Sequence, residues 1–295
     1  MQVRKYRILI ILLSVSFPLF SQFNTYSPYT RFGLGDLVRG GLAQNLAMGG
    51  TGIAVHENNR INYLNPAAFS ALDSTSVYFD LGANTFHNEY KTENYSNSWW
   101  NMNLHHVAFA TSMGKYLGLS AGIVPYSSIG YNIKQEYNDY VTGDAMDVYY
   151  KGDGGIMNIY LGASFKLFNR VSLGASMNYL LGRLTRERLI EFPVNARYSV
   201  ASSMENFDLQ QPVFRFGLQY REVIRDKFFF TLGGAYDLQA NVGASLQYSL
   251  TNNIYGTNPA FLNDSVVVDP EYSVGEDTIS NNFSIPPRTA LGISL

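Results

Sequence analysis

From residue 75 onward, apolar positions alternate with polar or small ones along most of the chain. The alternation is clearest in six runs, at 77–84, 117–123, 158–167, 171–179, 214–220 and 228–232. Successive side chains of a β-strand point to opposite faces of a sheet, so this period of two predicts strands with one apolar and one polar face. About eight such runs are present, the last at 283–295. The pattern predicts an all-β, antiparallel fold.

The connections between these runs alternate in length. Short turns are expected at 114–115, 168–170 and 225–226, whereas 136–155 and 186–211 are predicted to be long polar loops. Short turns at one end and long loops at the other are typical of outer-membrane barrels. A soluble sandwich would also alternate, but its polar face should carry Lys and Glu rather than Gly, Ser, Asn and Tyr. We therefore predict a transmembrane β-barrel over residues 75–295.

The segment before the strands is different. Residues 26–72 show no sustained alternation and mix Gly with bulky apolar residues, with a short helical turn expected at 42–48. Backbone that faces lipid must be hydrogen-bonded within the protein, so this segment cannot coat the outside of a barrel. We predict that residues 22–74 form either a periplasmic appendage or a plug in the lumen.

The alternation is still running where the sequence stops at Leu295. A closed eight-stranded barrel is the competing interpretation. Its lumen would be filled by side chains, which leaves no room for the segment before residue 75. We therefore expect that C-terminal strands of the barrel are missing from these 295 residues.

Composition and charge agree with an exported β-protein. Aromatic and charged residues each make up 15% of the chain, and there are 26 Gly and no Cys, which excludes disulfides and thiolate chemistry. Basic residues at 4, 5 and 7 precede an apolar stretch at 8–20 that is too short to span a bilayer, so 1–21 is predicted to be a signal peptide. No later stretch is apolar enough for a transmembrane helix. Without the leader, 21 − 3 = 18 basic residues face 23 acidic ones, and this acidic balance argues against nucleic acid as a partner.

Two short motifs suggest a family. GGTGIAV at 49–55 is followed by NPAAFSAL at 65–72, directly before the first strand, and the stretches 119–143 and 157–187 continue the pattern. In order and spacing the chain resembles the FadL/TodX family of outer-membrane transporters, and its opening at 26–37 is similar to a branch of largely unassigned substrates. The resemblance implies a monomeric 14-stranded barrel with a plugging N-terminal hatch. It also implies passage of hydrophobic small molecules, such as long-chain fatty acids, into the bilayer.

The resemblance also assigns roles to individual residues. Asn65, Pro66 and Ala67 would form the last element of the hatch, against the barrel wall. The hatch part of the substrate path would pass Phe32, Leu34 and Met48.

A kink is expected in the third strand run. Pro125 lies within this run, and proline cannot donate to a strand ladder. Gly122 and Gly130 flank it and ease bending. The resemblance to the FadL/TodX family implies that such a kink opens a lateral gap for the substrate. The alternative is a harmless proline at a strand end near the membrane interface.

Charged lumen positions allow two roles. Arg215 lies on a predicted inner face, and Asp80 and Asp237 can face inward too. The three residues can form a structural ion pair that holds the plug, because a confined polar interior needs paired charges. Alternatively, Arg215 contacts a substrate carboxylate.

Several motifs point to chemistry that the context disfavours. Residues 118–122 match G-x-S-x-G, but Ile123, Val124 and Pro125 cannot start the helix that a nucleophile elbow needs. Gly33-Leu34-Gly35 lacks the strand and third glycine of a phosphate loop. We expect no enzyme activity, no cofactor and no metal.

Two clusters of possible metal ligands are also present. The adjacent residues His105 and His106 should point to opposite faces of a strand, so we do not expect them to share a metal. Acidic residues at 139, 144, 147 and 153 are expected in an external loop, solvated or holding a surface cation.

The resemblance thus implies a passive outer-membrane transporter for hydrophobic small molecules, with outer-membrane lipid and that substrate as its partners. The alternative is a barrel of the type IX secretion system that docks client proteins through the loop at 138–152. A general water-filled porin is disfavoured by the predicted hatch.

Overall fold

We describe a computed structural model of the chain. The described residues are 25–38, 40–74, 76–91, 93, 96–138, 145–168, 170–191, 201–224, 228–252 and 273–295. The predicted signal peptide at 1–21 lies outside them.

Ten long or medium strands follow a short N-terminal segment. The strands are β2 Val77–Lys91, β3 Ser96–Met113, β4 Leu117–Asn138, β5 Ala145–Leu167, β6 Val171–Glu191, β7 Ala201–Ile224, β8 Phe228–Asp237, β9 Ala240–Asn252, β10 Ser273–Ile285 and β11 Arg288–Ser294. The N-terminal segment contains the 3-10 helix η1 Pro28–Arg31, the two-residue strand β1 Asp36–Leu37, the helix α2 Ala43–Ala47 and the 3-10 helix η2 Pro66–Ala71. The helical turn expected at 42–48 is thus confirmed. Within the described ranges, no helix is long and apolar enough to cross a membrane.

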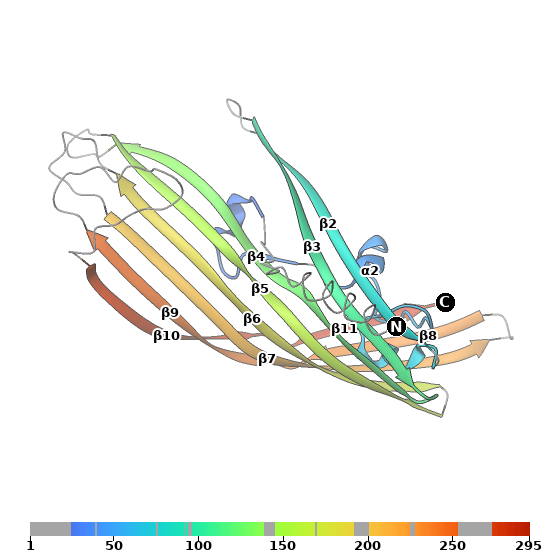
Figure 1. The fold of residues 1–295 in the computed structure, drawn as a ribbon. Helices are drawn as coiled ribbons and strands as arrows, with labels where there is room; N and C mark the ends of the chain where they lie inside the picture. Colours follow the sequence, from blue (N-terminus) through green and yellow to red (C-terminus); the bar gives the residue numbers. More distant parts are fainter. Residues whose placement is uncertain are drawn as a thin grey trace, which may run out of the picture.

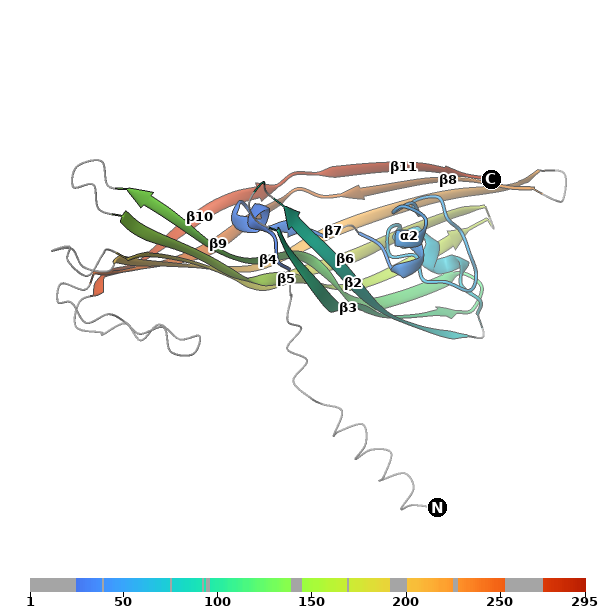
Figure 2. The same cartoon turned by 90° about the horizontal axis from the view of Figure 1, so that it is seen from above.

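All neighbouring strands pair antiparallel, which confirms the all-β prediction (Figure 1). Strand β7 pairs with β9 through 201–208 and with β8 through 215–224, so β8 and β9 act as one interrupted strand. Strands β10 and β11 likewise act as one interrupted strand, in which β10 pairs with β9 and β11 pairs with β8. Pro286 and Pro287 separate the two parts. The result is a strongly curled half-barrel built from eight long strands, with β2 at one side and β10 and β11 at the other (Figure 2).

The two faces of the curled sheet differ as the alternation predicts. Glycines and small polar side chains line the concave face, and many of these side chains are buried, among them Ser120, Asn158, Ser176 and Asn178. Large apolar side chains stand on the convex face and are exposed, among them Leu161 (63%), Phe165 (49%), Leu173 (45%), Phe216 (47%) and Leu218 (49%). The convex face is therefore apolar in the lower part of β4–β8.

The predicted long polar loops are wrong for most of their length. Strands β4 and β5 pair without interruption from Ser127–Ile156 up to Asn138–Ala145, and β6 pairs with β7 as far as Ile190–Ala201. Cross-strand pairs stabilise these polar upper ends, for example the ion pair of Lys134 with Asp147 at 3.0 Å. The polar residues of these stretches therefore belong to the solvent-exposed ends of long strands and not to loops.

The N-terminal segment packs on the concave face. Helix η2 lies on the backbones of β5, β6 and β7, where glycines replace larger residues. A Cβ atom at Gly174 would overlap the Pro66 carbonyl carbon, and one at Gly217 would overlap the Asn65 side chain. Phe69 is 1% exposed and fills the space over Gly162. The glycines thus allow direct contact between the N-terminal segment and the concave face of the sheet.

The curled sheet splits between β3 and β4. Their ladder begins at Met113–Leu117 and ends at Val107–Ile123, above which the β2–β3 hairpin diverges from β4 (Figure 1). A β-bulge at Pro125/Ser127 shifts the register of β4 against β5 at the same level. Because Tyr126 is the extra residue, the buried positions change from even numbers such as Val124 to odd numbers such as Ile129.

We predict that Gly174→Ala destabilises the protein by about 1–3 kcal/mol, because the new methyl group meets the backbone of η2. The measurement is the free energy of unfolding in detergent, from a urea titration. Gly234→Ala is the matched control, since its methyl group would have the Leu291 side chain as its nearest neighbour, at 3.6 Å. Equal effects of the two substitutions would contradict the close approach.

Candidate functional site

Asn65 anchors the N-terminal segment to the wall. Its side chain is fully buried, and its Oδ1 accepts from the Ala67 backbone N–H at 3.1 Å, which caps η2. Its Nδ2 donates to the carbonyls of Ile53 (2.7 Å) and Leu218 (3.2 Å). The amide therefore joins two parts of the segment to β7.

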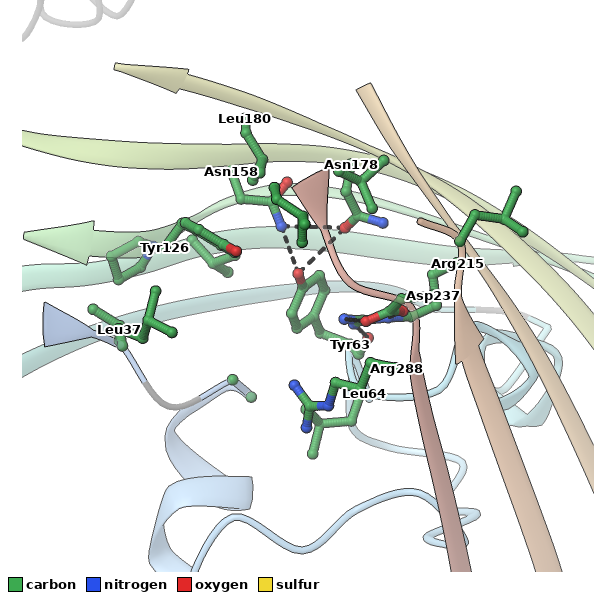
Figure 3. A pocket seen from close by; sticks show the side chains of 18 of the residues that line it. Leu37, Tyr63, Leu64, Tyr126, Asn158, Asn178, Leu180, Arg215, Asp237 and Arg288 are labelled. Carbon is green, nitrogen blue, oxygen red and sulfur yellow. Dashed lines mark hydrogen bonds and ion pairs between the residues drawn. The ribbon is translucent and has the colours of Figure 1, made fainter. Parts of the chain in front are cut away.

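A first cavity of about 430 Å³ is lined by Tyr63 and Leu64, the two residues before this anchor (Figure 3). Its polar centre is formed by Tyr63, Asn158 and Asn178. Asn158 Nδ2 donates to the Tyr63 hydroxyl at 2.5 Å and to Asn178 Oδ1 at 3.1 Å. Apolar side chains surround these groups, including Leu37, Leu64 and Leu180.

An ion pair closes one side of the first cavity. Arg215 Nε and Nη2 donate to the two Asp237 oxygens at 2.5 and 3.0 Å, and the guanidinium lies 5.1 Å from the Tyr63 ring centroid. Both charged side chains are largely buried, at 13% and 18% exposure. Asp80, which was also predicted to face inward, is not part of this ion pair. Its carboxylate contacts His106 Nε2 at 3.1 Å.

A second cavity of about 520 Å³ occupies the split between β3 and β4. Side chains of β2 and β3 line one side of it, and residues 36–38 line the other. Leu37, Val38, His105 and Pro125 border both cavities. Pro125 thus lies at the bulge and beside both spaces, while Gly122 lies under Tyr160 and Gly130 under Thr25.

The histidines on β3 correct the sequence prediction. Gly82 pairs with His106 and Ala83 with Leu104, so His105 is the extra residue of a bulge. Both rings consequently lie on the same side, with their Nδ1 atoms 2.9 Å apart, and both are buried. Gly82 makes room for the His106 ring. Simple alternation could not reveal a bulge of this kind.

The N-terminal segment bridges the split. The Tyr26 ring stacks on Trp99 of β3 at 4.9 Å, and the next residue, Ser27, donates its N–H to the Gly130 carbonyl of β4 at 2.8 Å. Lower down, β1 pairs antiparallel with Ser127 and Ser128 of β4. Sequence analysis missed this strand because two residues carry no periodicity.

The residues of the predicted substrate path are not brought together. Phe32 is 74% exposed, and Leu34 packs with Ile129 near the upper part of β4. Met48 lies beside Val55 and His56, in contact with a different cavity. Asn65, Pro66 and Ala67 lie on β5–β7 as described above.

The other motifs have structural partners. Residues 118–122 lie within β4, where Ser120 Oγ contacts the Tyr160 hydroxyl and the Phe109 carbonyl, each at 3.0 Å. Asp147 and Asp153 lie on β5, whereas positions 139 and 144 are outside the described residues. Among the positions that the structure describes, no three His, Asp or Glu side chains are arranged to hold a metal ion.

A hydrogen-bonded histidine of the N-terminal segment contacts β7. Gln219 Nε2 donates to the carbonyls of Ile53 and Val55, which leaves its Oε1 to accept from His56 Nδ1 at 2.9 Å. The pKa of His56 is lowered to about 4, mainly by burial, with a smaller contribution from the nearby cations Arg221 and Lys166, while the hydrogen bond to Gln219 opposes the shift.

The structure defines a mostly-β protein with a strongly curled antiparallel half-barrel sheet and an N-terminal segment packed on its concave face. The chain belongs to the BamG family, whose model matches residues 2–295. This family is associated with the β-barrel assembly machinery and has an outer-membrane or envelope setting. No curated protein and no solved structure matches the chain.

The family match corrects the functional prediction. The FadL/TodX relationship is wrong, and with it fatty-acid transport and the type IX secretion alternative. The motifs behind it, GGTGIAV and NPAAFSAL, serve a packing purpose here. They supply the turn glycines and the Asn65-capped helix η2, which fit the N-terminal segment onto the glycine-rich concave face of the sheet.

We predict that Arg215→Met and Asp237→Leu each destabilise the protein by about 3–5 kcal/mol, because each leaves a buried charge without its partner. The double variant should lose much less than the sum of the two. A double-mutant cycle on the free energy of unfolding tests this. Additive losses would show that the pair does not act as a unit.

We predict that stability rises with pH between about 4 and 6.5. In this range the unfolded chain protonates His56 while the folded chain does not, so acid favours unfolding by up to roughly 3 kcal/mol. The contribution is complete above pH 6.5 and is lost as pH falls toward 4. Urea titrations at pH 4.5 and 7.5 measure it, and His56→Gln should flatten the difference. An unchanged pH dependence in that variant would contradict the assignment.

Proposed function

We propose that this protein is an outer-membrane subunit of the β-barrel assembly machinery. The observation that carries the proposal is the family match over nearly the whole chain. In this role the protein would hold or support other members of the machinery at the membrane, without catalysing a reaction.

The apolar convex face of the sheet suits a position in the outer membrane. We propose that its convex face contacts outer-membrane lipid, because exposed side chains such as Phe165, Leu173 and Phe216 are costly in water. A strand needs about 9–11 residues to cross the bilayer, whereas β5 and β7 have 23 and 24. Their polar upper halves would then extend beyond the lipid, where partner proteins can contact them.

The N-terminal segment suits the role of a plug. Its anchors, Asn65 and Phe69, are buried against the concave face, and the Arg215–Asp237 pair backs the segment at Tyr63. We propose that the segment keeps the inner space closed and stiffens the wall. A stiff scaffold supports assembly work better than an open pore does.

We predict that the affinity-tagged chain, extracted with mild detergent from its native membrane, co-purifies with the machinery's central barrel subunit. Mass spectrometry of the eluate is the measurement. An unrelated outer-membrane barrel with the same tag, expressed at the same level, is the control. Recovery of the chain alone, with the central subunit equally low in both samples, would overturn the proposed function.

A further inference from the structure

The chain contains two tryptophans, Trp99 and Trp100, which are neighbours on β3. Trp99 stacks on the Tyr26 ring of the N-terminal segment, with the ring centroids 4.9 Å apart. Trp100 pairs with His87 of β2, at 4.7 Å between the ring centroids, and is 74% exposed. Successive side chains of a strand point to opposite faces. Trp99 therefore faces the inside of the curled sheet, whereas Trp100 faces the outside.

Trp100 continues the apolar convex face onto the β2–β3 hairpin. Along β3, Phe109 (50% exposed), Met113 (61%) and Met102 (74%) also stand on the outer side. The bulge at His105 shifts the outward positions from odd numbers below it to even numbers above it. The outer side of β3 is therefore a mainly apolar column that runs from Met113 up to Trp100.

The column has an aromatic residue at each boundary. Beyond Trp100, the next outward pair is Ser98 with Glu89, and both residues are exposed. At the other end, Met113 is followed by Tyr116, which is 52% exposed in the short turn to β4. Trp and Tyr are enriched at the two interfaces of a membrane, and outer-membrane barrels have an apolar band between two aromatic girdles. The outer side of β3 has this pattern.

The length of the column fits a bilayer. From Met113 to Trp100 there are 113 − 100 = 13 steps, and the bulge takes up one of them. The remaining steps, at about 3.3 Å each, make a strand of about 40 Å. At the usual tilt of about 35–45° this strand rises about 28–33 Å, close to the roughly 30 Å of a hydrocarbon core.

A protein partner is the other surface that could cover Trp100. The core of a protein interface is a compact apolar patch with a polar rim. Here the apolar side chains form a band from one aromatic boundary to the other, and Phe79 (58% exposed) and Leu81 (57%) extend the band onto β2. A band of membrane height favours lipid over a protein partner.

We propose that the outer side of the β2–β3 hairpin contacts outer-membrane lipid up to Trp100, whose indole lies at the headgroup level. The ladder between β3 and β4 ends at Val107, which is 107 − 100 = 7 positions from Trp100. The lower part of the split therefore lies beside the hydrocarbon layer. This inference rests on the outer-membrane position in the proposed function, and it extends lipid contact to a hairpin that diverges from β4 (Figure 1).

The test uses the intrinsic fluorescence of the two indoles. Trp99→Phe leaves Trp100 as the one tryptophan of the chain, and Trp100→Phe leaves Trp99. Each purified full-length variant is reconstituted into phosphatidylcholine vesicles whose acyl chains carry bromine, a quencher, either near the headgroup or near the terminal methyl group. We expect Trp100 emission to fall by about half with bromine near the headgroup and clearly less with bromine near the methyl group, because Trp prefers the interface. Trp99, which is stacked on Tyr26, should keep its emission in both lipids.

A third variant calibrates the depth. Leu161→Trp, in a chain with both native tryptophans replaced by Phe, places one indole in the middle of the convex face of β5, where Leu161 is 63% exposed. Its emission should fall most with bromine near the methyl group.

Three results would overturn the inference. These are Trp100 emission that neither lipid lowers, Trp100 emission that falls most with bromine near the methyl group, and equal quenching of Trp99 and Trp100. If neither lipid quenches Trp100 while the indole at position 161 is quenched, the hairpin is left for a protein partner and the proposed function stands. If the indole at position 161 is not quenched either, the membrane position in the proposed function fails as well, and co-purification with the machinery tests the association independently.

Discussion

The close approach of residues 65–71 to the backbones of β5–β7 is the contact on which the rest of the structure depends. Glycines at 174 and 217 remove the side chains that would hold the segment away, and the Asn65 amide then ties it to Ile53 and Leu218. Tyr63, two residues before this anchor, is thereby placed against Asn158 and beside Arg215. The position of Tyr63 at the first cavity therefore depends on the close packing that these glycines allow.

A second constraint acts higher in the wall, where β3 and β4 each contain one extra residue. The bulges at His105 and Tyr126 reverse which residues face inward at nearly the same level. Below them, small residues face the segment. His105 at the β3 bulge and Asn101 above it are buried and line the second cavity. The same irregularity that ends the β3–β4 ladder thus turns polar side chains into the second cavity.

The sequence predicts the strands well and the site poorly. The strict alternation in runs such as 158–167 and 171–179 predicts their strands and faces, because each side chain has one of two environments. The bulge at His105 changes that parity without a Gly or Pro signal. The two-residue strand β1 and the pairing of Arg215 with Asp237 depend on tertiary placement. The polar ends of β5 and β6 were mistaken for loops because solvated strands have no apolar face.

The interruption between β8 and β9 coincides with the one between β10 and β11. Asp237 is the last residue of β8 and is paired with Arg288, the first of β11. The β9–β10 pair and the β8–β11 pair therefore meet at a corner of the sheet. Pro286 and Pro287, which lie at this corner, line the first cavity. Because Asp237 also binds Arg215, which donates to the Tyr63 carbonyl, this corner of the sheet is tied directly to the N-terminal segment.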